Sequence, residues 1–164
     1  MTIDSSLMMV WPTEKRVSKF LRILLSFTVG EFLPVVQFLC LLGHMVSLEK
    51  LVVGARLRMR SLQFHLRDNW SRDQPLLSLI PVSPELMPDL LWWRNREILF
   101  KGRPLHDPSP DHLLFTDASM QGWGAHLGDL QAAGKWNLSQ DLPHINYLEL
   151  SAVWEGLKSF LEVI

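Results

Sequence analysis

The sequence has only one cysteine and no long apolar run. Cys40 is the single cysteine among 164 residues, so an internal disulfide is excluded and a reducing compartment is expected. Cys40 itself lies in an apolar run and is expected to be a small core residue. The most apolar segment, residues 32–46, contains Pro34 and His44 and is shorter than the ~20 residues that span a bilayer. Residues 1–12 lack the basic and apolar regions of a signal peptide, so we expect an intracellular protein without membrane contact.

The chain also lacks an excess of charge, since its formal net charge is -1, but its charges are unevenly placed. Residues 48–72 contain six Lys and Arg residues against two acids, whereas residues 107–164 contain eight acids against two lysines. A basic segment is typical of nucleic-acid contact, and clustered acids suit a site that demands a cation. The six histidines have no metal-ligand spacing with cysteine, so no zinc site is expected.

Apolar spacing predicts three helices in the first 70 residues, which would form a small helical unit over residues 13–70. The first begins at Glu14 with Thr13 as its cap. Pro34 suits the first turn of the second, which runs towards Gly43. The third covers residues 50–70. The residues expected to form apolar faces are Val17, Phe20, Leu21 and Leu24 in the first helix and Val52, Ala55, Met59, Leu62 and Leu66 in the third.

The next segment is rich in proline. Seven of the ten prolines lie between Pro75 and Pro110, which predicts a linker or an extended packing segment with one short helix at residues 89–100. The run from Leu90 to Trp93 is too apolar for a free linker, so we expect it to pack on a neighbouring element. Residues 101–111 are expected to be a boundary.

Three strands and a helix are predicted after this boundary. The strands cover residues 113–116, 122–127 and 131–137, with Gly128 and Asp129 as a hairpin turn between the second and third. The helix covers residues 147–164, and its expected apolar face contains Leu150, Val153, Trp154, Leu157, Leu161 and Ile164. The order is β-β-β-α, and the whole chain is expected to belong to the α+β class.

Asp117 is a candidate metal ligand because it ends a strand with a buried pattern. A carboxylate in that place needs a second carboxylate nearby to hold a divalent cation through oxygen. The alternative is a turn, in which the side chain of Asp117 accepts hydrogen bonds from backbone N–H groups two residues on. Asp129 and Asp141 are expected to be structural acids of a turn and a loop.

Glu149 is the candidate partner of Asp117. It falls within about 40° of Val153 on a helical wheel, near the face that should cover the sheet, where an unpaired carboxylate is costly. Two roles remain open. In a capping box, Asn146 would be the N-cap and Glu149 would reach back to its N–H group. In the other role, Glu149 shares a metal ion with Asp117. Glu155 is expected to face solvent.

Four arginines in the basic segment also have two interpretations. Arg56, Arg58 and Arg60 would spread around a helix and form an ordinary solvated face. Alternatively, together with Arg67, they would track the phosphates of a nucleic acid. The aromatic and basic neighbours of these arginines mildly favour the second interpretation.

Four blocks in the last third of the chain, in order, resemble the ribonuclease H region of retroelement polyproteins. They are LLFTDAS, GWGAHL, AAGKW and HINYLELSAVWEGLKSF, and the resemblance is greatest to tyrosine-recombinase (DIRS-like) retrotransposons. Upstream, LLGHMVS, ARLRMRSLQFHL and LLWWRN are similar to the thumb and connection segment that joins reverse transcriptase to ribonuclease H in that group. The resemblance covers about residues 11–164.

The resemblance implies a domain organisation, a chemistry and a set of partners. Residues 11–72 would be a helical thumb/connection-like segment, residues 73–111 a Pro-rich tether, and residues 112–164 the N-terminal half of a ribonuclease H-like domain. Such enzymes cleave RNA in RNA–DNA hybrids with two Mg²⁺ ions, and Asp117 and Glu149 match two of their metal ligands. Asn146 matches a position that touches the minor groove of the hybrid. The rest of a polyprotein is a further partner that the resemblance allows.

The sequence departs from the family pattern in two ways. The family's third and fourth carboxylates come from elements after this helix, and the sequence has no counterpart of them. No two acidic residues adjoin, so the paired aspartates of the polymerase are also missing. Three functions follow as hypotheses: a nucleic-acid-binding remnant inactive on its own, a working ribonuclease H completed by another chain, or a non-enzymatic interaction module.

Overall fold

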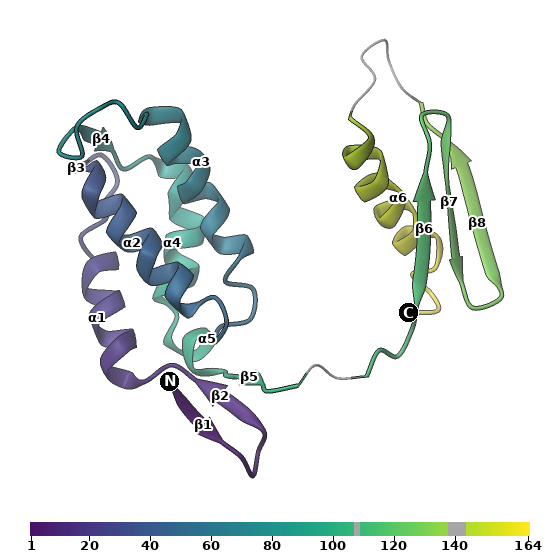
Figure 1. Cartoon of the computed structure of the whole chain (residues 1–164), viewed down its shortest axis with the longest axis horizontal. Coiled ribbons are helices and arrows are strands. Elements are labelled where there is room, and N and C mark those ends of the chain that lie inside the picture. Colours follow the sequence, from purple (N-terminus) through teal and green to yellow (C-terminus); the bar gives the residue numbers. More distant parts are fainter. Residues whose placement is uncertain (107–108, 138–143) are drawn as a thin grey trace. The chain divides into compact units, whose positions relative to one another are not determined.

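The chain folds into two compact units, Met1–Asp107 and Pro108–Ile164 (Figure 1). The computed structural model describes residues 1–106, 109–137 and 144–164. Both helices and antiparallel strands are present, which confirms the predicted α+β class.

The first unit is mainly helical and carries two small antiparallel sheets. Its helices are α1 (Glu14–Leu24), α2 (Val35–Leu48), α3 (Arg60–Asn69), α4 (Met87–Arg94) and α5 (Arg96–Phe100), with 3₁₀ turns at Leu57–Met59 and Pro84–Leu86. One sheet has the order β1 (Thr2–Asp4), β2 (Met9–Trp11), β5 (Arg103–Pro104), and the other pairs β3 (Phe32–Pro34) with β4 (Leu79–Pro81).

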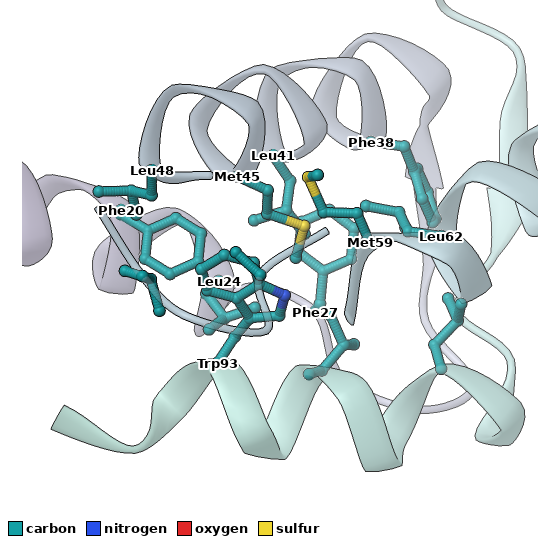
Figure 2. Packing of buried hydrophobic residues seen from close by; sticks show 14 of the residues in the cluster. Phe20, Leu24, Phe27, Phe38, Leu41, Met45, Leu48, Met59, Leu62 and Trp93 are labelled. Atoms are coloured by element: carbon teal, nitrogen blue, oxygen red, sulfur yellow. The ribbon is translucent and has the colours of Figure 1, made fainter. Parts of the chain in front are cut away.

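Aromatic side chains occupy the centre of the first unit's core (Figure 2). The Trp93 ring meets the Phe20 ring edge-to-face at 5.2 Å, and Phe27 meets Phe38 in the same manner at 4.9 Å. All four side chains are fully buried. Edge-to-face pairs add about 0.5–1.5 kcal/mol each to the stabilisation from burial, so these contacts hold α1, α2 and α4 together.

The predicted starts of the first two helices are correct, whereas the predicted start of the third helix at residue 50 is wrong. Helix α1 begins at Glu14 and buries Val17, Phe20 and Leu24. Helix α2 begins after Pro34 and continues through Gly43 to Leu48. The third helix begins only at Arg60, because residues before it form turns and Gly54 has a left-handed φ of 84°, which breaks a helix.

The segment predicted as a tether is part of the first unit. Residues 79–104 supply β4, α4, α5 and β5, and Leu90 and Trp93 are buried in the core. Pro84 and Pro88 do not oppose this because each lies in the first turn of a helical segment, where a missing N–H costs nothing. The division between the units falls instead at residues 107–108, within the predicted boundary.

Cys40 is exposed, so its prediction as a core residue is wrong. The buried stripe of α2 contains Val35, Phe38, Leu41, Met45 and Leu48. Cys40 falls off this stripe because its position does not match the helical spacing of those residues.

The second unit is an antiparallel sheet with one helix on it. Strands β6 (Leu114–Ala118), β7 (Gly122–Leu127) and β8 (Leu130–Lys135) lie in the order β6-β7-β8, and α6 (Ile145–Ser159) packs against β6 and β7. The predicted β-β-β-α order is therefore confirmed. Within the described part of the chain, β6 has a paired neighbour on one side alone.

Helix α6 presents the opposite face from the one predicted. The large side chains Leu150 and Trp154 are 69% and 62% exposed, whereas Leu148, Ala152 and Gly156 are buried. A Cβ atom at Gly156 would lie 3.0 Å from the Cβ of Ala125 and 3.3 Å from the Cγ2 of Thr116. The helix thus approaches the sheet closely along its small residues, and hydrophobicity alone does not identify that face.

Candidate functional site

Asp117 lies near the end of β6, on the sheet face that α6 does not cover. Thr116 and Leu114 lie close to Gly156 of α6, and alternate residues of a strand point to opposite faces. Asp117 therefore shares the open face with Phe115 and is exposed. Its register partner on β7 is Gly124, which has no side chain to cover the carboxylate.

Asp117 does not have the turn role. The Oγ of Ser119 accepts hydrogen bonds of 3.2 Å from the N–H groups of Gln121 and Gly122 and so holds the turn itself. Trp136 adds a hydrogen bond of 2.8 Å from its indole N–H to the Ser119 carbonyl oxygen. In the described residues, the Asp117 carboxylate makes no hydrogen bond or ion pair. The local structure therefore does not use this side chain.

The capping box at Glu149 is also wrong. Helix α6 begins at Ile145, two residues earlier than that box requires, because His144 is the N-cap and its Nδ1 accepts a hydrogen bond of 3.2 Å from the Asn146 N–H. Glu149 is then the fifth residue of the helix and too far along it to satisfy the cap. It is half-buried, and across the described ranges its carboxylate has no hydrogen bond or ion pair.

Asp117 and Glu149 lie at the same end of the second unit. Figure 1 shows that α6 begins at the end of the sheet where β6 ends. Gly156 lies beside Thr116, and Glu149 precedes it by seven residues, about 10 Å along the helix axis towards that end. Asp117 follows Thr116 in the same direction. The two carboxylates thus come from neighbouring elements at one end of the unit, with Asp117 on the sheet face opposite to α6.

A third metal-ligating side chain does not join them in the described structure. Among residues 1–106, 109–137 and 144–164, no group of three or more His, Cys, Asp and Glu residues is placed to hold a metal ion. Asp129 follows β7 in the hairpin turn, as predicted. The prediction for Asp141 concerns a position outside the described residues.

Arg58 has a structural role in the first unit. Its Nη1 donates a hydrogen bond of 3.0 Å to Asp89 in an ion pair, and its guanidinium lies 5.6 Å from the ring centre of Trp92. Its side chain is 38% exposed and that of Asp89 is 17% exposed. Because this guanidinium already binds Asp89 and contacts Trp92 on α4, it has less charge and fewer N–H donors available for a phosphate.

The other three predicted arginines are exposed to solvent. Arg60 donates to the side chain of Gln63 at 3.1 Å. Arg67 pairs with Asp68 at 2.7 Å, and this hydrogen bond lowers the pKa of Asp68. Because Asp68 and Asp89 each bind an arginine, part of the basic segment is neutralised. Arg56 and Arg60 keep the most available charge of the four.

The open face of the sheet carries a stacked pair that the sequence analysis missed. The rings of Phe115 and His126 stack at 4.6 Å with an angle of 7° between them, and the two residues are register partners. They line a shallow hollow of about 590 Å³ together with Asp117 and Gln131. The register of the hairpin, counted back from Gly128, was the signal that would have revealed the pair.

None of the helices in the described residues is long and apolar enough to cross a membrane. Comparison with known proteins adds no relative: no family model, curated protein or solved structure matches this chain.

Proposed function

We propose that the chain is a nucleic-acid-binding remnant of a reverse transcriptase and ribonuclease H region, and that it does not cleave RNA on its own. The order of β6, β7, β8 and α6 supports this proposal, since the family that the sequence resembles begins its nuclease domain in the same order. The proposal places the hybrid at the end of the second unit where Asp117 and Glu149 lie.

The observation that carries the proposal is that, among the described residues, neither carboxylate forms a hydrogen bond or ion pair that the local structure needs. Ser119 holds the turn after β6 and His144 caps α6, so neither Asp117 nor Glu149 is needed for these structures. Glu149 is half-buried and has no hydrogen-bond or ion-pair partner among the described residues, which carries a desolvation cost. A bound cation is one way to offset that cost.

The carboxylates of Asp117 and Glu149 are the right type of ligand for a hard divalent cation, but two of them are too few to hold it tightly. Carboxylate oxygens are the ligands that Mg²⁺ takes in proteins, and it usually retains several waters. When bound in a complete pair, such ions activate water and stabilise the leaving oxygen. Asp117 and Glu149 supply two carboxylates, and in the described residues no group of three or more His, Cys, Asp and Glu residues could hold a metal ion, so we expect weak binding and no turnover by this chain alone.

Nucleic-acid contact would come from both units. Asn146 is exposed in the first turn of α6, and only its backbone N–H, not its side chain, binds the cap. Its amide is therefore available to a 2′-hydroxyl of the hybrid. Arg56, Arg60 and Arg67 of the first unit would contribute affinity that depends on salt but not on sequence.

The experiment is a labelled RNA–DNA hybrid incubated with the full chain and Mg²⁺ or Mn²⁺, with binding followed by anisotropy and cleavage by gel. We expect binding without cleavage above background. The matched controls are Asp117→Asn and Glu149→Gln, which keep the size of each side chain. Absence of binding at low salt would refute the proposal. Cleavage that both substitutions abolish would refute the claim that the chain does not cleave RNA on its own.

A working nuclease completed by another chain is the second candidate, and it is favoured by the edge of β6 that no strand of the described residues pairs with. A strand edge with unpaired backbone groups is a template for another strand. Hydrogen exchange distinguishes the candidates: alone, β6 should exchange faster than residues 148–157 of α6. Slow exchange throughout β6 in a preparation that cleaves hybrid would support the second candidate.

A further inference from the structure

A groove between α1 and α2 collects positive charge in a part of the first unit that the proposed function does not use. It has a volume of about 480 Å³ and is lined by Arg16, Lys19, Cys40, Gly43, His44 and Ser47. Three of these six residues, Arg16, Lys19 and His44, have a cationic or protonatable nitrogen, and none is acidic. The two helices pack against each other, so the groove belongs to a fixed part of the fold.

The electrostatics of the groove favour an anion. Burial lowers the pKa of His44, and the charges of Lys19 and Arg16 lower it further, so the imidazole lies in a positive and partly desolvated environment. Glu14, the acid at the start of α1, is held by Arg96 at 2.7 and 2.8 Å and by Ser18 at 3.1 Å. Its charge is thereby directed to α5 and not to the groove.

Arg16 is positioned by the fold. Its Nη2 donates a hydrogen bond of 2.6 Å to the carbonyl oxygen of Ser47, which joins α1 to the last turn of α2. A guanidinium has five N–H donors, so this bond orients the group and leaves other donors for a ligand. The Ser47 hydroxyl donates to the His44 carbonyl oxygen at 2.7 Å and is already engaged.

Gly43 forms part of the wall of the groove. It lies inside α2, where glycine is less favourable than alanine. A Cβ atom at this position would meet no other atom within 4 Å, so packing within the described structure does not require glycine there. Because Gly43 lines the groove, a methyl group at this position would extend into it.

We propose that this groove binds a phosphate group, either within a nucleic-acid backbone or as free phosphate. Its oxygens would accept hydrogen bonds from Arg16, Lys19 and His44, three donors that come from two helices and surround one space. Phosphate oxygens are strong acceptors for such charge-assisted bonds. This site is separate from Asp117 and Glu149 and does not depend on the proposed nuclease ancestry.

The test is a titration of the full chain followed by backbone amide NMR shifts, with inorganic phosphate in one arm and a short single-stranded oligonucleotide in the other. Signals from Lys19, Gly43 and His44 should shift together in at least one arm. Lys19→Gln should weaken that binding about tenfold, the worth of one charge-assisted bond. Lys15→Gln is the matched control, because Lys15 is an exposed residue of α1 that does not line the groove.

Gly43→Ala distinguishes binding in the groove from binding to general surface charge, because the substitution changes no charge and favours the helix. It should raise thermal stability and weaken binding in the same arm. Shifts in the oligonucleotide arm alone assign the site to a phosphodiester, and shifts in both arms assign it to any phosphate. The proposal is overturned if neither arm shifts these residues, or if Lys15→Gln weakens binding as much as Lys19→Gln.

Discussion

The indole Nε1 of Trp93 donates a hydrogen bond of 3.0 Å to the backbone carbonyl oxygen of Arg58. The two residues are 35 positions apart, and the Arg58 side chain in turn reaches Asp89 on the same helix, α4. A buried indole N–H needs such an acceptor. This pair of contacts ties α4 to the turn before α3 and makes residues 87–94 part of the core.

We expect Trp93→Ala to destabilise the first unit by about 3–5 kcal/mol, the usual cost of removing a buried aromatic side chain. Trp93→Phe should cost less, about 1–3 kcal/mol, since it mainly leaves the Arg58 carbonyl oxygen without its donor. Urea denaturation followed by circular dichroism measures both. Leu91→Ala is the control, because Leu91 is 54% exposed and should change stability by about 0.5 kcal/mol or less.

Substitutions on the two faces of α6 should change stability to different extents. Gly156→Leu should destabilise the second unit by about 1–3 kcal/mol or more, because a larger side chain must displace Ala125 and Thr116. Leu150→Gln should cost about 0.5 kcal/mol or less, since Leu150 is exposed. Thermal unfolding of the full chain, followed by amide signals of β7, gives both values. A larger loss for Leu150→Gln would mean that the large apolar face is the buried one.

The arginines of the basic segment should separate into two groups. Arg56→Ala and Arg60→Ala should each lower the salt dependence of hybrid binding by about one unit or less in the slope of log K, with no loss of stability. Arg58→Ala should instead destabilise the fold, because Asp89 loses its partner. Binding titrations at several salt concentrations, beside denaturation curves, test this division. Equal slopes for wild type and both exposed variants would exclude phosphate contact here.

The pKa of His44 should lie below its ordinary value of 6.5 and should rise towards that value in Lys19→Gln. Because the folded state disfavours the protonated imidazole, the unfolded chain takes up the proton first as the pH falls. Stability from this group is therefore present above pH 6.5 and declines as the pH falls below it. NMR titration of the imidazole C–H signals gives the pKa. A pKa of His44 at or above 6.5 would contradict the described environment.

Local patterns predicted the strands well because each strand carries its own signal. Gly128 and Asp129 mark the hairpin, and alternation around Ala125 and Leu127 defines β7 from Gly122 to Leu127. The same kind of signal placed the start of α1 at Glu14. These elements follow from neighbouring residues, so no distant contact was needed to find them.

Features that depend on distant contacts were missed. The buried face of α6 is determined by the close approach of Gly156 to Ala125, which the hydrophobicity of the helix does not reveal. The packing partners of Trp93, which are Phe20 and Arg58, lie far away in the sequence and were missed, although the packing of the Leu90–Trp93 run on a neighbouring element was predicted and is confirmed by the burial of Leu90 and Trp93. For the candidate site, the sequence left a turn role for Asp117 and a capping role for Glu149 open, and only the structure shows that Ser119 and His144 are the hydrogen-bond acceptors there.

The proposed sharing of one cation by Asp117 and Glu149 can be measured by paramagnetic broadening with Mn²⁺. Because two carboxylates leave most of the ion's ligands as water, we expect weak binding, in the millimolar range. We expect that amide signals around both residues broaden at the same Mn²⁺ concentration, and that either Asp117→Asn or Glu149→Gln removes both effects. Broadening around one residue that survives substitution of the other would contradict it.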